Sequence, residues 1–161
     1  MSAGQVFVSN AVNDAFNELY RGNGRAVLVI EQKNGQLVPN VEHVHGRKVD
    51  VTCLAQSLSL PDQDVVYLFL RCRYATDSGA TRKKIVFVPW IPDSIVRPTL
   101  KESAALKFHG VTDAGRVQGA CNFRGIRIGA NRADDLSLDI VRAKLLKGER
   151  DALVGEIELD E

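Results

Sequence analysis

The chain has 161 residues and a mass of 17.7 kDa, which is the size of a single domain. Apolar residues make up 45% of it and charged residues 25%, the ordinary balance of a globular protein. Its 21 basic and 20 acidic residues leave a net charge of +1. That balance argues against a general electrostatic grip on nucleic acid or an anionic membrane, so any basic site must be local.

Hydropathy and cysteine usage indicate a cytoplasmic protein. The longest apolar run covers residues 65–70, far short of the ~20 residues that a membrane-spanning helix needs. The first residues lack the basic region and apolar core of a signal peptide. Cys53, Cys72 and Cys121 are odd in number and widely spaced, so we expect reduced thiols and no disulfide.

The start of the chain predicts a helix followed by a hairpin. Apolar residues recur with helical spacing over residues 9–22, and Gly22 ends the pattern. The apolar runs at 26–30 and 36–38 flank Asn34-Gly35, a strong turn signal because both residues tolerate positive φ.

A short helix over residues 50–58 and a second hairpin follow. Residues 65–74 form the first strand of this hairpin and 84–91 the second, joined by a polar turn at 76–79. Pro89 donates no hydrogen bond to a ladder, so we expect a bulge or an unpaired position there.

The last third predicts helix, strand and helix. Residues 98–123 are helical in part, as one kinked helix or two, with Leu100, Ala104 and Phe108 on one face. A short strand at 124–128 and a helix over residues 133–148 complete the chain.

The element order predicts an α/β or α+β fold, a mixed sheet with flanking helices. We expect a single domain over residues 1–150. Residues 151–161 carry five acids and no cation, and we expect them to form a flexible tail.

No catalytic or metal-binding constellation is evident. His43 and His45 lie on one face of an extended segment, but no third ligand has supporting spacing, so we expect neither metal nor cofactor. Each cysteine lies in an apolar pattern that favours an inert thiol. No phosphate-binding glycine motif is present in the sequence.

Two stretches of the sequence are more basic than the rest of the chain. One is the run Arg82-Lys83-Lys84 at the start of a predicted strand, where its simplest role is to discourage edge pairing. The other is the segment 116–150, with eight cations against four acids. A nearly neutral protein thus separates its charges along the chain, as a basic patch or as a solvated face.

The first of these features resembles the actin-depolymerising factor homology (ADF/cofilin) family. Cofilins carry a basic cluster, an aliphatic-aromatic strand and then Trp-x-Pro-Asp, and this chain reads RKKIVFVPWIPD over residues 82–93. The opening hairpin at 25–39 and the closing segment at 122–145 are most similar to coactosin. The resemblance covers residues 9–148 and implies the ADF-homology fold, with five to six central strands flanked by helices on both faces.

The resemblance also implies a non-enzymatic, monomeric protein of the cytoplasm and cytoskeleton that binds filamentous actin. In this family a basic pair at the entrance of the strand and cations late in the last helix contact actin. The residues that it implies for this chain are Arg82, Lys83, Lys84, Arg97, Lys107, Lys144 and Lys147. Clustered cations steer association with an acidic partner, and apolar contacts supply affinity.

The chain departs from cofilins at the start of the long helix. Cofilins have Met-x-Tyr-Ala-Ser-Ser-Lys there, and this chain has LKESAAL over residues 100–106. Binding of monomeric actin and severing are therefore not expected, as in coactosin. Residues 97–106 resemble a small insertion relative to coactosin. Ser2 is a candidate phosphorylation switch of the cofilin type.

Three alternatives stay open. A cofilin-type factor would also bind monomers and sever filaments. A small hydrolase or metal protein would use His43, His45 and a cysteine. An adaptor would keep the fold, bind another partner and be insensitive to charge reversal at Lys84.

Overall fold

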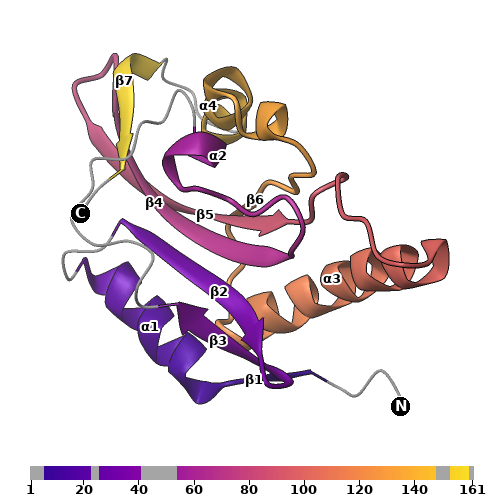
Figure 1. The fold of residues 1–161 in the computed structure, drawn as a ribbon. Coiled ribbons are helices and arrows are strands. Elements are labelled where there is room, and N and C mark those ends of the chain that lie inside the picture. Colours follow the sequence, from indigo (N-terminus) through magenta and orange to yellow (C-terminus); the bar gives the residue numbers. More distant parts are fainter. Residues whose placement is uncertain (1–5, 23–25, 41–53, 148–152, 160–161) are drawn as a thin grey trace.

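The computed structural model describes residues 6–22, 26–40, 54–147 and 153–159 (Figure 1). The strands are β1 (Phe7–Val8), β2 (Val27–Lys33), β3 (Gln36–Asn40), β4 (Val66–Thr76), β5 (Thr81–Trp90), β6 (Ile126–Arg127) and β7 (Leu153–Leu159). The helices are α1 (Asn10–Arg21), α2 (Leu54–Ser57), α3 (Leu100–Ala120), the 3₁₀ helix η2 (Ala133–Leu136) and α4 (Leu138–Leu146).

The strands of the described residues form one mixed sheet in the order β1-β3-β2-β4-β5-β6. At its centre β4 and β5 pair antiparallel from Val66↔Trp90 to Ala75↔Thr81. On its other side β4 changes partner. Residues 66–70 pair with β2, and Cys72 to Thr76 pair with β7.

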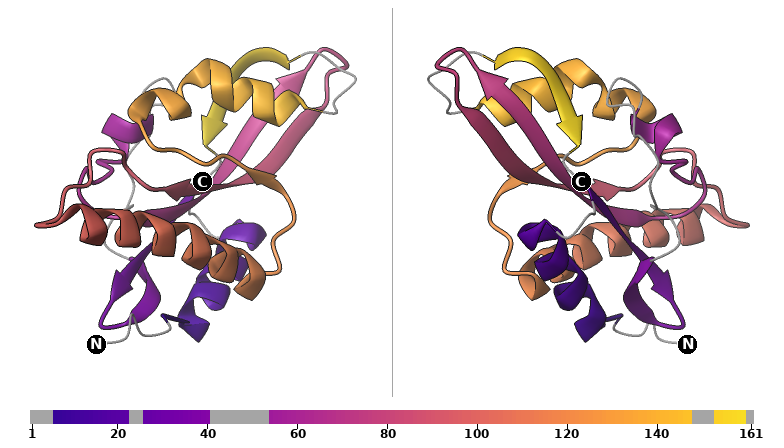
Figure 2. Two further views of the ribbon diagram at one scale, coloured as in Figure 1. Left: turned by 90° about the vertical axis from the view of Figure 1, so that its right-hand side faces the viewer. Right: turned by 90° about the vertical axis from the view of Figure 1, so that its left-hand side faces the viewer.

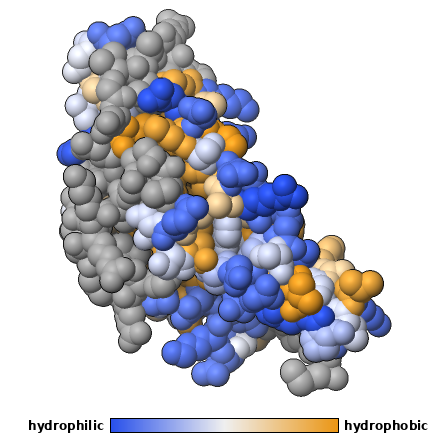
Figure 3. All heavy atoms as spheres, turned by 45° about the horizontal axis from the view of Figure 1, so that its top comes forward, coloured by the Kyte–Doolittle hydropathy of each residue, from blue (hydrophilic) through white to orange (hydrophobic). Residues whose placement is uncertain are grey.

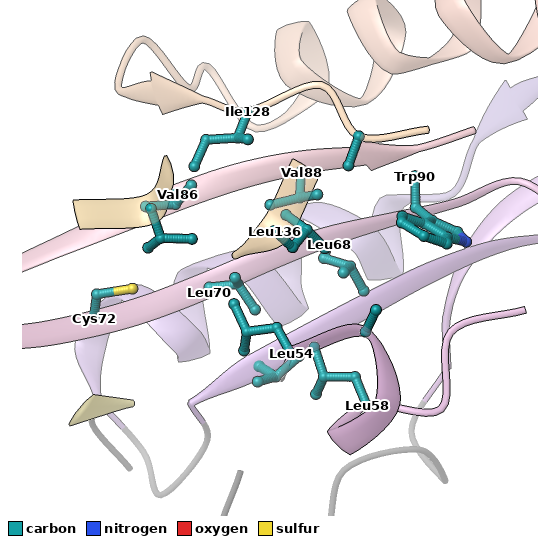
Figure 4. Close-up of a cluster of buried hydrophobic side chains, with 14 of the residues drawn as sticks. Leu54, Leu58, Leu68, Leu70, Cys72, Val86, Val88, Trp90, Ile128 and Leu136 are labelled. Atoms are coloured by element: carbon teal, nitrogen blue, oxygen red, sulfur yellow. The ribbon is translucent and has the colours of Figure 1, made fainter. Parts of the chain in front are cut away.

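Helices cover both faces of this sheet (Figures 1 and 2). On one face α2, η2 and α4 enclose a cluster that includes Leu68, Val88 and Trp90 (Figure 4). On the other face α1 and α3 pack over Tyr67, Phe69 and Phe87. Both faces are apolar because residues of alternating direction on β4 and β5 are large hydrophobes, the pattern of a strand buried on both sides.

The first helix matches its prediction. Ser9 accepts from the Ala11 N–H at its start, and Gly22 ends it at φ 78°. A Cβ at Gly22 would lie 2.8 Å from the Arg71 Cζ. Glycine is therefore needed both for the left-handed backbone and for the close approach of the guanidinium, whose Nη1 donates to the Leu19 carbonyl (3.4 Å).

The two hairpins are also confirmed. Asn34 and Gly35 both have positive φ between β2 and β3. Residues 54–57 of the second predicted helix form α2, and its first residues, 50–53, lie outside the described residues. The second hairpin starts its return strand at Thr81 rather than at residue 84.

The prediction of a bulge at Pro89 is wrong. Tyr67 and Pro89 pair in register with no shift along the ladder. The Pro89 carbonyl accepts from the Ala130 N–H at 3.0 Å, so this residue directs its backbone polar groups away from β4. The missing N–H therefore costs the β4 ladder nothing, because it falls on the side of the short strand β6.

Two helix predictions need correction. The stretch predicted as one or two helices is a single helix, α3, and Thr99 caps its start by accepting from the Glu102 N–H. The helix thus begins two residues later than the predicted range, and Pro98 precedes it. The last helix does not begin at residue 133. Residues Ala133–Leu136 form the 3₁₀ helix η2 instead. The helix α4 begins after Ser137, whose hydroxyl accepts from the Ile140 N–H and so caps the helix.

The prediction of a flexible acidic tail is wrong for residues 153–159. They form β7, which pairs antiparallel with β4, and Ile157 is 1% exposed in the cluster beneath α4. The acidic composition of this stretch indicated a tail, although acidic and apolar residues alternate at 156–158 as they do in a strand.

The burial of Ile157 gives a direct test of β7. Replacing Ile157 with Ala should lower the free energy of unfolding by about 2–4 kcal/mol, because it empties a packed core position. Val111→Ala, at a position 57% exposed, serves as the control and should cost well under 1 kcal/mol. Urea denaturation measures both, and equal midpoints for the two variants would contradict the burial of β7.

Candidate functional site

The implied actin-binding cations fall into three places rather than one. Arg82 and Lys84 start β5 on the face that carries α4, while Lys83, between them, points to the opposite face. Arg97 lies in the loop before α3 and Lys107 in the first half of α3. That half of the helix extends away from β7 and α4 (Figure 1).

Lys84 connects β5 to the end of α4. Its Nζ donates to the Leu145 carbonyl at 3.0 Å and lies 5.9 Å from the centre of the Tyr74 ring. The Tyr74 hydroxyl donates to the same carbonyl at 3.5 Å. A cation at a helix C-terminus interacts favourably with the helix dipole, so Lys84 has a structural role whatever else it contacts.

The cations Arg82, Lys144 and Lys147 surround this connection and are exposed. Lys144 lies in the last turn of α4 and Lys147 directly after it. With Lys84 they form what we call the β5–α4 basic cluster. The structure thus brings together the basic strand entrance and the late-helix cations, which lie sixty residues apart in the sequence.

Arg97 and Lys107 hold the loop between β5 and α3. The Arg97 Nη2 donates to the Gln63 carbonyl at 2.8 Å and pairs with Asp64 at 3.4 Å. The Lys107 Nζ donates to the Asp93 carbonyl at 3.1 Å. Both cations therefore fix the position of the first half of α3.

The first half of α3 carries an apolar stripe that faces solvent. Leu100 is 91% exposed, Phe108 69% and Val111 57%, and Ala104 on the same side is exposed too. Hydrophobic side chains reach the surface over this part of the helix on the right of Figure 3. The sequence interpretation placed Leu100, Ala104 and Phe108 on one face, but this face is not the one that packs on the sheet.

The opposite side of α3 contacts the sheet through small residues. A Cβ at Gly110 would lie 3.2 Å from the Val65 Cγ2, and the Tyr67 hydroxyl donates to the Gly110 carbonyl at 2.8 Å. Ala114, Val117 and Cys121 continue this buried side. The signal for the exposed stripe was in the sequence, because α3 has two apolar stripes and only one faces the sheet.

A buried carboxylate lies where α3 meets the sheet. Asp113 is 5% exposed and accepts from the Arg116 Nη1 at 3.2 Å. Burial raises the pKa of Asp113 above its usual value, and the nearby Arg116 and His109 oppose that rise. Burial also raises the pKa of Tyr67, with a smaller contribution from the charge of Asp113.

The two described thiols are buried, which makes them poor nucleophiles. Cys72 and Cys121 are buried and free, and burial raises their pKa values to about 12 and about 11. Over the described ranges no group of three or more His, Cys, Asp or Glu could hold a metal ion. His43, His45, Cys53 and Ser2 lie outside the described residues. The helices that the structure describes include none long and apolar enough to cross a membrane.

Lys84 and Arg82 allow the structural role of Lys84 to be tested. Lys84→Met keeps the aliphatic stem but removes the donor to Leu145, so unfolding should become easier by about 1 kcal/mol. Arg82→Met removes an exposed cation from the same strand and should leave the stability unchanged within about 0.5 kcal/mol. Thermal unfolding of both variants is the measurement, and identical melting temperatures would refute this role.

Asp113 predicts a pH dependence of stability. Because folding raises its pKa, the folded protein holds this proton more tightly than the unfolded chain. Its contribution to stability is thus fully present below pH 3.8, the ordinary value, and is lost as the pH rises through the folded-state pKa. The stability of wild type relative to Asp113→Asn should fall across that range in denaturant titrations. Parallel curves at all pH values would exclude the shift.

Comparison with known proteins gives a family match over most of the chain. The model of the family described as cofilin/tropomyosin-type actin-binding protein matches residues 5–146. No curated protein matches the chain.

Solved structures confirm the ADF-homology fold. Human coactosin-like protein is similar with a TM-score of 0.67 at 15% identity, covering 97% of each chain. Coactosin from Entamoeba histolytica gives 0.64 at 20% identity, over 88% of this chain and 94% of that one. Streptomyces griseoflavus cofilin gives 0.63 at 17% identity, over 85% and 96%.

Proposed function

Because the chain belongs to the cofilin/tropomyosin-type actin-binding protein family, we propose that it binds the sides of actin filaments in the manner of a coactosin. It acts without catalysis, as a monomer in the cytoplasm, and regulates the actin cytoskeleton. The observation that carries this proposal is the solvent-facing stripe of Leu100, Ala104, Phe108 and Val111 on α3.

A contiguous exposed apolar surface is thermodynamically unfavourable in water unless a partner covers it. Large patches of this kind mark interaction sites. On α3 the stripe supplies the apolar centre of an interface, and Phe108 is its aromatic anchor. Arg97 and Lys107 fix the helix that carries it. A rigid helix loses little conformational freedom on binding, which favours affinity.

The β5–α4 basic cluster is the second part of the proposed surface. Its cations are Arg82, Lys84, Lys144 and Lys147, and they steer association with an acidic filament. This cluster lies far from the start of α3, toward the opposite end of the sheet (Figure 1). Two separated contacts suit a filament, in which neighbouring subunits are available at once.

The acidic residue at the start of α3 supports a preference for filaments. Glu102 lies in the first turn, where it interacts favourably with the helix dipole. The same charge repels an acidic partner at the position where cofilins grip monomeric actin. The second candidate is a cofilin-type factor that also binds monomers and severs filaments, and the exposed apolar side chain of Val96, which lies before α3 and outside the stripe, would add to such a contact.

Cosedimentation with filamentous actin at low and moderate salt tests the proposal. Wild type should pellet with filaments, and less so as salt rises, because screening weakens charged contacts. Phe108→Ser should weaken binding by about 2 kcal/mol, roughly 30-fold, as loss of an aromatic anchor does. The double change Arg82→Glu and Lys144→Glu should remove the salt-sensitive part.

The matched control is Lys33→Glu, an exposed cation at the end of β2, which should pellet like wild type. No pelleting of wild type at any salt would overturn the proposal and favour an adaptor with another partner. Binding of monomeric actin as tight as that of filaments would favour the cofilin-type candidate instead.

A further inference from the structure

The segment 126–130 lies at one edge of the sheet, and we call it the β6 edge. It runs parallel beside β5 (Figure 1). The Ile128 N–H donates to the Phe87 carbonyl at 2.9 Å, and the Ala130 N–H donates to the Pro89 carbonyl at 3.0 Å. No strand of the described sheet lies beyond β6. The side of this segment that faces away from β5 is therefore an outer edge of the described sheet.

Arg127 and Gly129 direct their backbone groups to this outer side. In an extended segment the N–H and C=O groups of successive residues point to opposite sides. Because Ile128 and Ala130 donate to β5, the residues between and before them face outward. Arg127 and Gly129 are both exposed, so another strand can reach these groups. An open row of backbone groups is a template for strand pairing.

The β6 edge is held firmly by its inward side chains. Ile128 and Ala130 are buried in the cluster beneath α4, and Ile126 packs against the same cluster. At Gly129 a Cβ would meet no atom within 4 Å, so a neighbouring backbone can approach this position without a clash. The edge is thus preformed, and it loses little conformational freedom when a partner binds.

The β6 edge is also basic. Residues 122–131 contain Arg124 and Arg127, both exposed, and no acid. The Arg127 Nη1 donates to the Gln118 Oε1 at 3.0 Å, a neutral partner that leaves the positive charge uncompensated. Just past the segment, Arg132 and Asp93 form an ion pair at 3.1 Å and offset each other. Charge complementarity at this edge therefore favours an acidic partner.

We propose that the β6 edge binds an extended acidic peptide of another protein, which adds to the sheet as a further strand. The peptide backbone pairs with the outward N–H and C=O groups of Arg127 and Gly129, and its carboxylates lie beside Arg124 and Arg127. In strand addition the main-chain hydrogen bonds supply affinity and the side chains supply specificity. This interaction goes beyond the proposed contact with actin and does not depend on it.

A second copy of this chain fits the β6 edge less well than an acidic peptide. Two copies paired about a two-fold axis would bring Arg127 of each copy toward the same edge. Like charges that face each other across a strand pair are destabilising. Charged side chains on a short edge strand are a known obstacle to pairing between identical chains, whereas they attract a strand of opposite charge.

The probe is a blocked heptapeptide that alternates threonine and glutamate, and the readouts are amide chemical shifts and hydrogen exchange of the full chain. Binding should saturate with millimolar or tighter affinity and slow the exchange of the Arg127 and Gly129 amides. A peptide with lysine in place of glutamate should bind at least ten-fold more weakly. The glutamate peptide methylated on its backbone nitrogens keeps its charge but donates no ladder hydrogen bond, and it should lose as much.

Three results with these peptides would overturn the proposal. They are no saturation by the glutamate peptide, shifts centred away from the β6 edge, and equal binding of the methylated peptide. The last result would mean that charge alone holds the peptide. A dimer of the unbound protein in sedimentation equilibrium, lost in Gly129→Pro, would overturn the choice of occupant in favour of a second copy.

Two variants of the chain assign peptide binding to its residues. Gly129→Pro removes an outward N–H at an edge position that tolerates proline, and it should weaken binding about ten-fold or more. Arg127→Glu keeps every backbone group and reverses one charge, and it should cost about ten-fold as well. Lys33→Glu makes the same charge change at the end of β2 and should bind like wild type. Melting temperatures show that each variant is folded, and wild-type affinity in Arg127→Glu would reject the site.

Discussion

The ladder between β4 and β5 carries large apolar side chains on both of its faces, and the helices of the described structure pack against one face or the other. Two faces need two helical layers, because an apolar sheet face left in water is costly. This requirement places the end of α4 beside Lys84 and the second half of α3 over Tyr67. The candidate surfaces follow from that placement.

The length of α3 exceeds what the sheet can cover. The helix packs from Gly110 to its end, and the turns before Gly110 extend past the sheet (Figure 1). The apolar stripe on this extended part faces solvent in the part of the chain that the structure describes. The domain thus offers a rigid, preformed apolar surface whose position is set by the packing of the other half of the same helix.

Much of this fold could be predicted from local signals, and the failures have a common cause. The spacing of apolar residues and the capping residues predicted α1, and Asn34-Gly35 predicted the hairpin of β2 and β3. Both predictions were correct because these features depend on neighbouring residues alone. Other features depend on how segments far apart in the sequence pack together. These are the exposed position of Phe108, the contact of Lys84 with Leu145, and the pairing of residues 153–159 with β4. The acidic composition of residues 153–159 resembled that of a tail, although Glu156-Ile157-Glu158 alternates polar and apolar residues as strands do.

The change of partner along β4 has a consequence for synthesis of the protein. The half of β4 from Cys72 to Thr76 pairs with β7, which the ribosome makes after every other strand of the described sheet. Until β7 emerges, that half presents an unpaired edge, and the core position of Ile157 is empty. Such an edge is a template for intermolecular pairing. The nascent chain therefore exposes this edge until β7 docks.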